Sequence, residues 1–141
     1  MTINQISIFL ENKFGKLNEI LSILNKENIR IIAATVADTS DYGILRIITS
    51  DQQKAYNLLQ EKHVSANLSE VIAIETDPVI GKFAETIELF TQAGISIEYM
   101  YCFSINRKAM LVLCTRNLET AFEVIRGNGL NCIRESELAE F

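Results

Sequence analysis

Apolar residues in the first half of the chain alternate in some segments and recur at helical spacing in others. Residues 3–10 alternate, which predicts a strand, whereas residues 15–26 carry apolar side chains three and four positions apart, as an amphipathic helix does. The expected elements are strands 3–10, 29–37, 43–49 and 64–68 and helices 15–26 and 51–62. Asp51 is a suitable N-cap for the second helix.

The second half repeats the first at a distance of 66 residues without a gap. Ten positions are identical, namely 6, 8, 15, 16, 19, 29, 31, 45, 49 and 55 with 72, 74, 81, 82, 85, 95, 97, 111, 115 and 121. Most other pairs exchange one apolar side chain for another, as Leu17 for Phe83. Because chance would not keep this phase over the whole copy, the chain is a tandem repeat. The second copy is expected to have strands 71–76, 95–105, 109–115 and 130–134 and helices 81–92 and 118–126.

Each copy has the order βαββαβ, which is the split-βαβ arrangement of ferredoxin-like folds. We expect an α+β protein made of two tandem ferredoxin-like units. Each unit is expected to be an antiparallel sheet with its helices on one face. The expected domains are residues 1–69 and 70–141, which join near residues 69–71.

The second and third strands of the first copy are apolar on both faces. The second strand is expected to place Ile29, Ile31 and Ala33 on one face and Ile32, Ala34 and Val36 on the other. A sheet covered by helices on one side only shows a polar set on its other side. We therefore expect another sheet to cover the second face, and the chain to form a homodimer.

Composition and charge narrow the class of partner. The chain is 48% hydrophobic and 22% charged, as a globular protein is, and its formal charge of −5 argues against a nucleic-acid partner. No apolar stretch approaches the ~20 residues that span a bilayer, so no membrane partner is expected. The first residues do not look like a signal peptide, and a cytoplasmic location is expected.

Few residues in the chain could carry catalysis. Cys102, Cys114 and Cys132 lie in apolar, strand-like segments without metal-ligand spacing, so core thiols are expected in preference to nucleophiles or metal ligands. His63 is the only histidine, and a surface or helix-end position is favoured over a catalytic or metal role. No catalytic, phosphate-binding or metal motif was found. We expect no enzyme activity, no cofactor and no metal.

The loop between the first strand and first helix of each copy is the remaining candidate for a binding site. The candidate residues are Glu11, Asn12, Lys13, Phe14 and Gly15 in copy one and Asp77, Val79, Ile80 and Gly81 in copy two. A helix start presents unpaired N–H groups that suit a carboxylate, while the acidic and Asn side chains could accept hydrogen bonds from an ammonium group. The alternative is ordinary helix capping with a tight turn.

Each copy has one motif in common: a strand, an acidic residue or Asn, two spacers, Gly, any residue, and Leu or Phe at a helix start. This motif resembles the ACT domain family, and the resemblance covers the whole chain, once per copy. The usual loop of that family is Asp-x-Pro-Gly. Here Phe14 and Ile80 stand in place of the proline, and Asp77 stands one position early. The resemblance implies units that pair side by side through their second strands and bind an amino acid at the junction.

Carried onto this sequence, the resemblance implies that loop 77–82 faces Ile31 and its neighbours in residues 29–35. It likewise implies that loop 11–16 faces Ile97, Glu98 and Tyr99 within residues 95–101. If the acidic and tyrosine side chains line a pocket, histidine or an aromatic amino acid fits better than aspartate or glutamate. The alternative is that the tyrosines are core or interface anchors.

The function expected from these observations is a regulatory sensor that binds a free amino acid and has no catalysis of its own. The resemblance to free-standing double-ACT proteins implies that a regulated enzyme is a partner. The alternative is a structural or protein-interaction adaptor that binds no small molecule.

Overall fold

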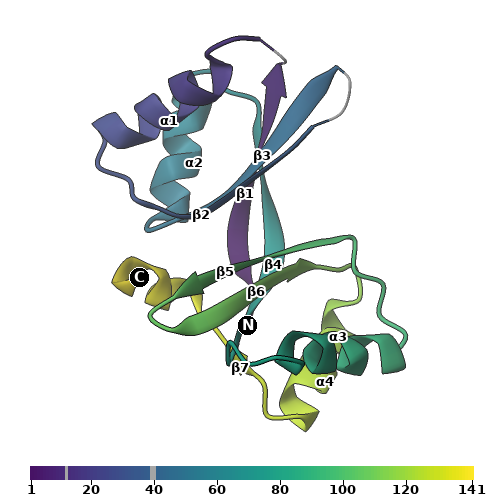
Figure 1. Ribbon diagram of the computed structural model, residues 1–141. Helices are drawn as coiled ribbons and strands as arrows, with labels where there is room; N and C mark the ends of the chain where they lie inside the picture. Colours follow the sequence, from purple (N-terminus) through teal and green to yellow (C-terminus); the bar gives the residue numbers. More distant parts are fainter. Residues whose placement is uncertain (12, 39–40) are drawn as a thin grey trace. The chain divides into compact units, whose positions relative to one another are not determined.

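The chain divides into two compact units. Figure 1 shows the computed structural model, which describes residues 1–11, 13–38 and 41–141. The N-terminal unit consists of Asn4–Ser69 with Ser136–Phe141. The C-terminal unit consists of Glu70–Glu135 with Met1–Ile3. The last residues of the chain therefore belong to the N-terminal unit, and the first three to the C-terminal unit.

The N-terminal unit has four neighbouring strands in the order β2-β3-β1-β4. Its elements are β1 (Ile3–Glu11), α1 (Lys16–Lys26), β2 (Ile31–Asp38), β3 (Tyr42–Thr49), α2 (Gln52–Glu61) and the start of β4 (Ala66–Thr76), with the 3-10 helix η1 (Glu135–Glu140). Strand β3 pairs antiparallel with both β1 and β2. The Phe9 N–H donates to the Ser65 carbonyl over 3.0 Å and joins β1 to the segment that leads into β4.

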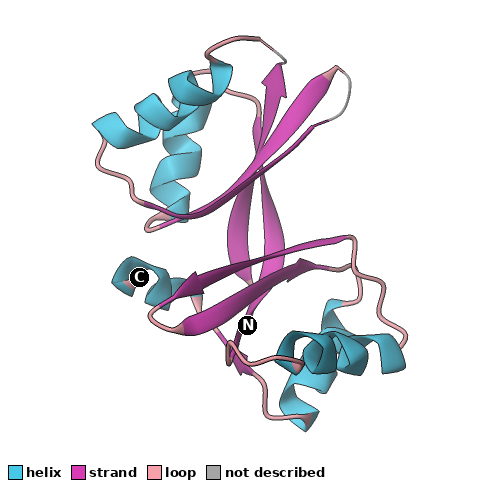
Figure 2. Cartoon of the chain, in the orientation of Figure 1, coloured by secondary structure: helices cyan, strands magenta, loops and turns pink. Residues whose placement is uncertain are grey.

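The C-terminal unit repeats this plan with the order β5-β6-β4-β7. Its elements are the end of β4, α3 (Lys82–Gln92), β5 (Tyr99–Ile105), β6 (Lys108–Cys114), α4 (Leu118–Gly127) and β7 (Asn131–Cys132). Strand β6 pairs antiparallel with both β4 and β5. Figure 2 shows the two helices of each unit lying together on one side of that unit's strands.

Strand β4 serves both units. Its residues 66–69 belong to the N-terminal unit and form that unit's fourth strand, whereas residues 70–76 form the first strand of the C-terminal unit. A single strand therefore connects the two copies without a loop between them.

Each unit has its own hydrophobic core between its helices and its strands. In the N-terminal unit Ile6, Ile8 and Ile47 pack with helix residues Leu24 and Leu59. The C-terminal core contains the equivalent residues 72, 74, 113, 90 and 125. These clusters confirm the α+β class and the tandem ferredoxin-like architecture, with helices on one face.

The face assignment expected for the second strand was wrong beyond Ile31. A register shift between Ile31 and Ala33 indicates a β-bulge, after which Ala34 pairs with Ile47 and Val36 with Leu45. Because paired residues of an antiparallel ladder share a face, Ala34 and Val36 lie on the helix side, as Ile31 does. The extra residue reverses the alternation, which a strand that is apolar on both faces does not reveal.

The structure also corrects two strand lengths in the second copy. Strand β5 begins at Tyr99, so residues 95–98, which were expected to be its start, are not part of it. The last strand, expected over residues 130–134, is reduced to Asn131–Cys132. The first difference arises because Ile95 and Ile97 alternate like strand residues but pack into the core without pairing to another strand.

Candidate functional site

The two candidate loops have the same backbone hydrogen bonds. In the N-terminal unit the Lys13 N–H donates to the Glu11 carbonyl over 2.7 Å, and in the C-terminal unit the Val79 N–H donates to Asp77 over 2.8 Å. The next bond is equivalent too, from the first helical residue back to Lys13 or Val79. Asp77 therefore corresponds to Glu11 in the fold. Asn12 lies outside the described residues.

A glycine in the left-handed conformation ends each loop and begins the helix. Gly15 has φ +84° and Gly81 has φ +89°, and a Cβ atom at either position would meet no atom within 4 Å. Conformation, and not crowding, therefore accounts for glycine at these positions.

The helix starts that follow these glycines have no side-chain cap. Neither Gly15 nor Gly81 can supply one, and no other described side chain does so. By contrast, the Asp51 carboxylate accepts from the Lys54 N–H over 3.0 Å at the start of α2, which confirms Asp51 as an N-cap. At α4 the Thr115 hydroxyl accepts from the Asn117 N–H over 3.2 Å. The first turns of α1 and α3 therefore offer N–H groups to an anion.

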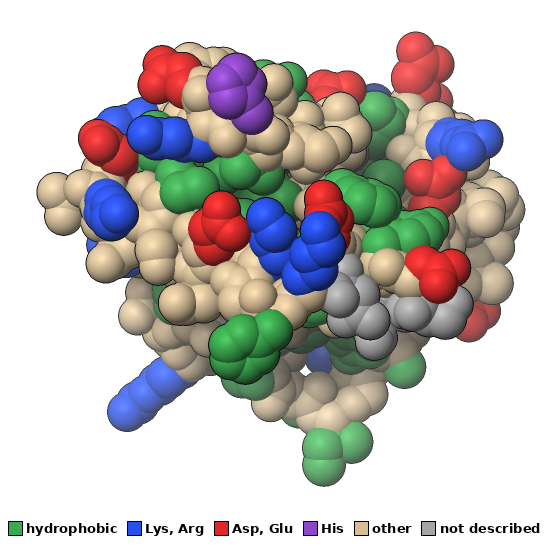
Figure 3. All heavy atoms as spheres, turned by 90° about the horizontal axis from the view of Figure 1, so that it is seen from above, with side chains coloured by type: hydrophobic (Ala, Val, Ile, Leu, Met, Phe, Trp, Pro, Cys, Tyr) green, Lys and Arg blue, Asp and Glu red, His purple; other side chains and the backbone are tan. Residues whose placement is uncertain are grey.

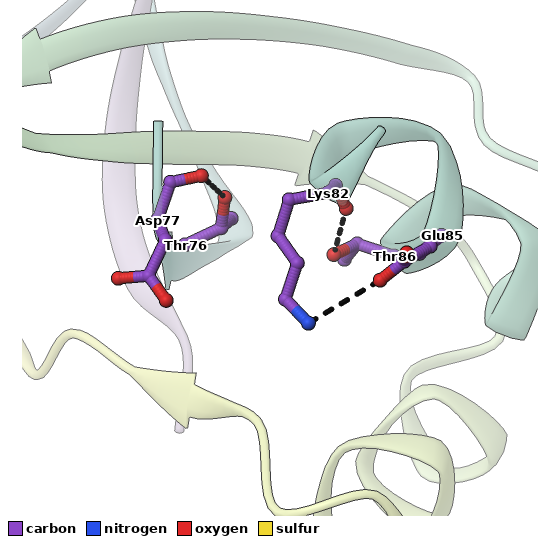
Figure 4. A network of polar contacts seen from close by, with 5 residues as sticks. All are labelled: Thr76, Asp77, Lys82, Glu85 and Thr86. Carbon is purple, nitrogen blue, oxygen red and sulfur yellow. Dashed lines mark hydrogen bonds and ion pairs between the residues drawn. The ribbon is translucent and has the colours of Figure 1, made fainter. Parts of the chain in front are cut away.

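The acidic residues of the two loops differ in their surroundings. Glu11 forms an ion pair with Lys13 over 2.8 Å, and the hydrogen bond from Lys13 lowers the pKa of its carboxyl. The Asp77 carboxylate forms no hydrogen bond or ion pair with a described residue and points away from the Lys82–Glu85 ion pair in Figure 4, although its charge helps to raise the pKa of Lys108, which pairs with Glu75. Asp77 is therefore the better placed acceptor for a ligand ammonium group.

The tips of both loops are apolar and exposed. Phe14 and Ile80 are fully exposed, and Val79 is 65% exposed. In the N-terminal unit the tip continues into a shallow hollow of about 460 Å³ formed by Phe14, Gly15, Leu17, Asn18 and Leu21. This hollow was not expected from the sequence. The sequence feature that could have predicted the hollow is a second set of apolar residues on the outer side of the helix.

The residues expected opposite the loops have other contacts within their own units. Ile31 and Ile97 pack against the hydrophobic cores of their units. Glu98 accepts from the Arg116 guanidinium over 2.6 Å, and its N–H donates to the Cys114 carbonyl over 2.9 Å. Tyr99 begins β5 and is half-buried, on the face opposite the helices.

Strands β2 and β5 stand at the ends of the strand orders of the two units. Each has one described neighbour, β3 or β6. On their helix sides Val36 is 51% and Met100 is 36% exposed. An edge strand with exposed apolar side chains is suited to pairing with another strand.

The cysteines are free, and one of them contradicts the expectation of core thiols. Cys132 packs against the C-terminal core, whereas Cys102 is exposed on the edge strand β5. Partial desolvation of the sulfur atoms raises the pKa of both thiols, which disfavours the nucleophilic thiolate. No group of three potential ligands that could hold a metal was found among residues 1–11, 13–38 and 41–141.

Acidic and basic side chains are mixed on the face of the molecule shown in Figure 3, where they form no continuous basic patch. His63 is exposed just after α2, at a helix end, as the sequence predicts. Within the described part of the chain, no helix is both long and apolar enough to cross a membrane.

Comparison with known families and structures gives matches that extend over the whole chain. The ACT domain pair family matches residues 1–141. The crystal structure of protein BT0572 from Bacteroides thetaiotaomicron has a TM-score of 0.94 and 38% identity, and covers 100% of this chain and 98% of that one. No curated protein matches the sequence.

Regulatory subunits of aspartate kinase share the fold at lower identity. The ligand-free subunit from Thermus thermophilus has a TM-score of 0.62 at 14% identity, covering 88% of this chain and 91% of that one. The subunit from Thermus flavus has a TM-score of 0.58 at 15% identity, covering 88% and 90%.

Proposed function

The chain belongs to the ACT domain family, as a pair of ACT domains, and on that basis we propose that it is a sensor of a free amino acid. ACT domains are regulatory and not catalytic, so a regulatory role follows from membership of the family. The observation that carries the proposal is the uncapped start of α3 beside the carboxylate of Asp77, which accepts no hydrogen bond from a described residue. Together they offer donors for a carboxylate and an acceptor for an ammonium group.

In the proposed complex the amino acid lies between a loop of one unit and an edge strand supplied by a second copy of the chain. Its carboxylate accepts hydrogen bonds from the first turn of α3, and its ammonium group donates to Asp77. Loop 11–16 is the weaker site, because Lys13 already neutralises Glu11. Tyr99 on β5, which is expected opposite loop 11–16, favours histidine or an aromatic amino acid as the ligand of that weaker site.

The proposal includes a homodimer in the cytoplasm that regulates an enzyme. The exposed apolar side chains Val36 and Met100 on the two edge strands support pairing with a second copy. Ligand binding at that junction would change how the two chains of the dimer pair, and the regulated enzyme would respond to that change.

A thermal-shift screen of the full chain against the twenty amino acids tests the proposal. A ligand that binds only the folded state at one hundred times its Kd stabilises it by about 2.7 kcal/mol, so one or a few amino acids should raise the unfolding midpoint. The same amino acid should give a much smaller rise with Asp77→Ala. A screen in which no amino acid raises the midpoint would contradict the sensor.

That negative result would favour an adaptor that binds a protein and no small molecule. The fully exposed Phe14 and Ile80 at the loop tips are the observation in favour of this second function, because exposed apolar tips suit a protein partner.

A further inference from the structure

A hollow within the N-terminal unit adjoins loop 11–16, with which it shares Glu11 and Lys16, and belongs to a different unit from Asp77. It has a volume of about 210 Å³ and forms where the end of β1, the first turn of α1 and the connection from α2 to β4 meet. Leu10, Ile20 and Val64 supply apolar lining, and Lys62 and His63 supply cationic or polar lining. All of these residues belong to one unit, so the hollow needs no second copy.

The charged groups around the hollow fall into two classes. Lys16 pairs with Glu19 over 3.4 Å and Glu11 pairs with Lys13 over 2.8 Å, so these four charges are matched. The side chains of Lys62 and His63 form no hydrogen bond or ion pair with any described residue. The hollow therefore has unmatched donors and no unmatched acceptor carboxylate among its described lining residues.

The two units differ in the side chains of the turn that borders the hollow. His63 has φ +57°, in the left-handed region, and its counterpart in the other unit is Gly129 with φ +63°. The turn has the same conformation in both units, and glycine adopts it without strain. Lys62 likewise corresponds to the uncharged Asn128.

We propose that this hollow is a second small-molecule site, present only in the N-terminal unit, that binds a small carboxylate-bearing ligand. The carboxylate is held by the Lys62 ammonium and the His63 imidazole, and the apolar lining contacts the rest of the molecule. A volume below the roughly 300 Å³ at which typical ligand pockets begin limits the ligand to a small organic acid or a small amino acid.

The single histidine makes the site easy to observe, because His63 is the only source of imidazole signals in an NMR spectrum of the full chain. At constant pH we would titrate with succinate, with L-valine and with isobutylamine, which lacks a carboxylate. Saturable shifts of the His63 signals with succinate alone identify an organic-acid site, and shifts with L-valine identify an amino-acid site. No shift with either carboxylate, or equal shifts with isobutylamine, would overturn the proposal.

A variant that copies the turn of the other unit provides the second test. Lys62→Asn combined with His63→Gly reproduces Asn128 and Gly129, whose backbone conformation is the same, so the fold should be retained. Affinity for the carboxylate that binds, measured by calorimetry, should fall at least about tenfold. Lys26→Asn, which removes an exposed cation outside the hollow, should leave it unchanged. Equal affinities in the double variant and the unaltered protein would contradict the site.

This second site and the proposed sensor fail separately. Asp77 and the α3 start are intact in the double variant. An amino acid that stabilises the protein through Asp77, together with a hollow that binds neither probe, would leave the sensor standing and remove the second site.

Discussion

At the scale of single residues, the two copies share backbone conformations even where their residues differ. Gly15 and Gly81 both have a left-handed backbone conformation. So do two further equivalent pairs, Asn28 with Gly94 and His63 with Gly129, whose φ angles lie between 56° and 72°. The N-terminal unit thus tolerates two side chains in a region that glycine favours. The glycine at each helix start is common to both copies, where the proposed ligand site needs the backbone exposed.

Replacing these helix-start glycines should cost stability without creating a clash. Gly15→Ala and Gly81→Ala should each lower the free energy of unfolding by about 1–2 kcal/mol, because alanine is disfavoured at positive φ and meets no atom there. Gly127→Ala is the matched control, since that glycine lies in α4 at ordinary φ. Denaturant unfolding should show Gly127→Ala as neutral or stabilising. A loss equal to that of Gly81→Ala would refute the conformational explanation.

The unequal surroundings of the loop acids predict unequal effects on binding. Asp77→Ala should weaken binding of the stabilising amino acid by roughly 1.5–3 kcal/mol, the loss of a charge-assisted hydrogen bond, or about ten- to a hundredfold in affinity. Glu11→Ala should have a smaller effect, because Lys13 already pairs with Glu11. Calorimetry on both variants decides. Equal effects would mean that the Glu11–Lys13 ion pair does not distinguish the loops.

At the scale of elements, the two helices of the N-terminal unit differ in whether a side chain caps their starts. Asp51 caps α2, whereas α1 and α3 begin without a side-chain cap directly after their loops. The capped helix contributes to the stability of the fold, and the uncapped helices retain donors for a ligand. The first helix of each copy has such a start although the loop residues around the glycine differ, and α4 also lacks a cap from its N-cap side chain.

The cap of α2 can be tested against a helix start that has none. Asp51→Ala should lower the free energy of unfolding by about 1 kcal/mol, because the Lys54 N–H loses its acceptor. Asn117→Ala, at the N-cap of α4, should change little, since the Asn117 side chain makes no capping bond. Chemical denaturation of both variants provides the comparison, and an equal loss at Asn117 would be inconsistent with the observed caps.

At the scale of the whole molecule, the chain has two units that share β4 and two edge strands with exposed apolar side chains. The boundary between the two units falls within β4, between Ser69 and Glu70. The expected domain boundaries 1–69 and 70–141 stay a prediction. The edge strands β2 and β5 are the surfaces on which assembly would depend.

If two chains assemble through the edge strands β2 and β5, charged side chains introduced on these strands should dissociate the dimer. Sedimentation at micromolar concentration should show twice the mass of the chain, and Val36→Lys combined with Met100→Lys should shift the population toward monomer, because like charges on both edges repel. Because both side chains are exposed in the single chain, the double variant should remain folded. Glu123→Lys, on the exposed side of α4, is the control for a change of charge alone. A dimer that is unaffected by the edge variant would place the interface elsewhere.

The amino-acid sequence by itself determined the repeat, the order of elements, the class of fold and the Asp51 cap. These features depend on residues close together in the chain, such as apolar spacing in 15–26, or on comparison at a fixed offset. The helix-start glycines could be recognised in the same way, because Gly15 and Gly81 occupy the same place in both copies.

Only the tertiary structure decided the features that depend on pairing between distant segments. The bulge after Ile31 reverses the faces of β2, yet a strand apolar on both sides permits either phase. Glu98 is held by Arg116, eighteen positions away, and Cys102 lies on an exposed edge because nothing pairs with the outer side of β5 among the described strands. The physical reason is common to all three. Local periodicity shows that a segment is a strand, whereas its neighbours in the sheet decide its register, its exposed side and the partners of its side chains.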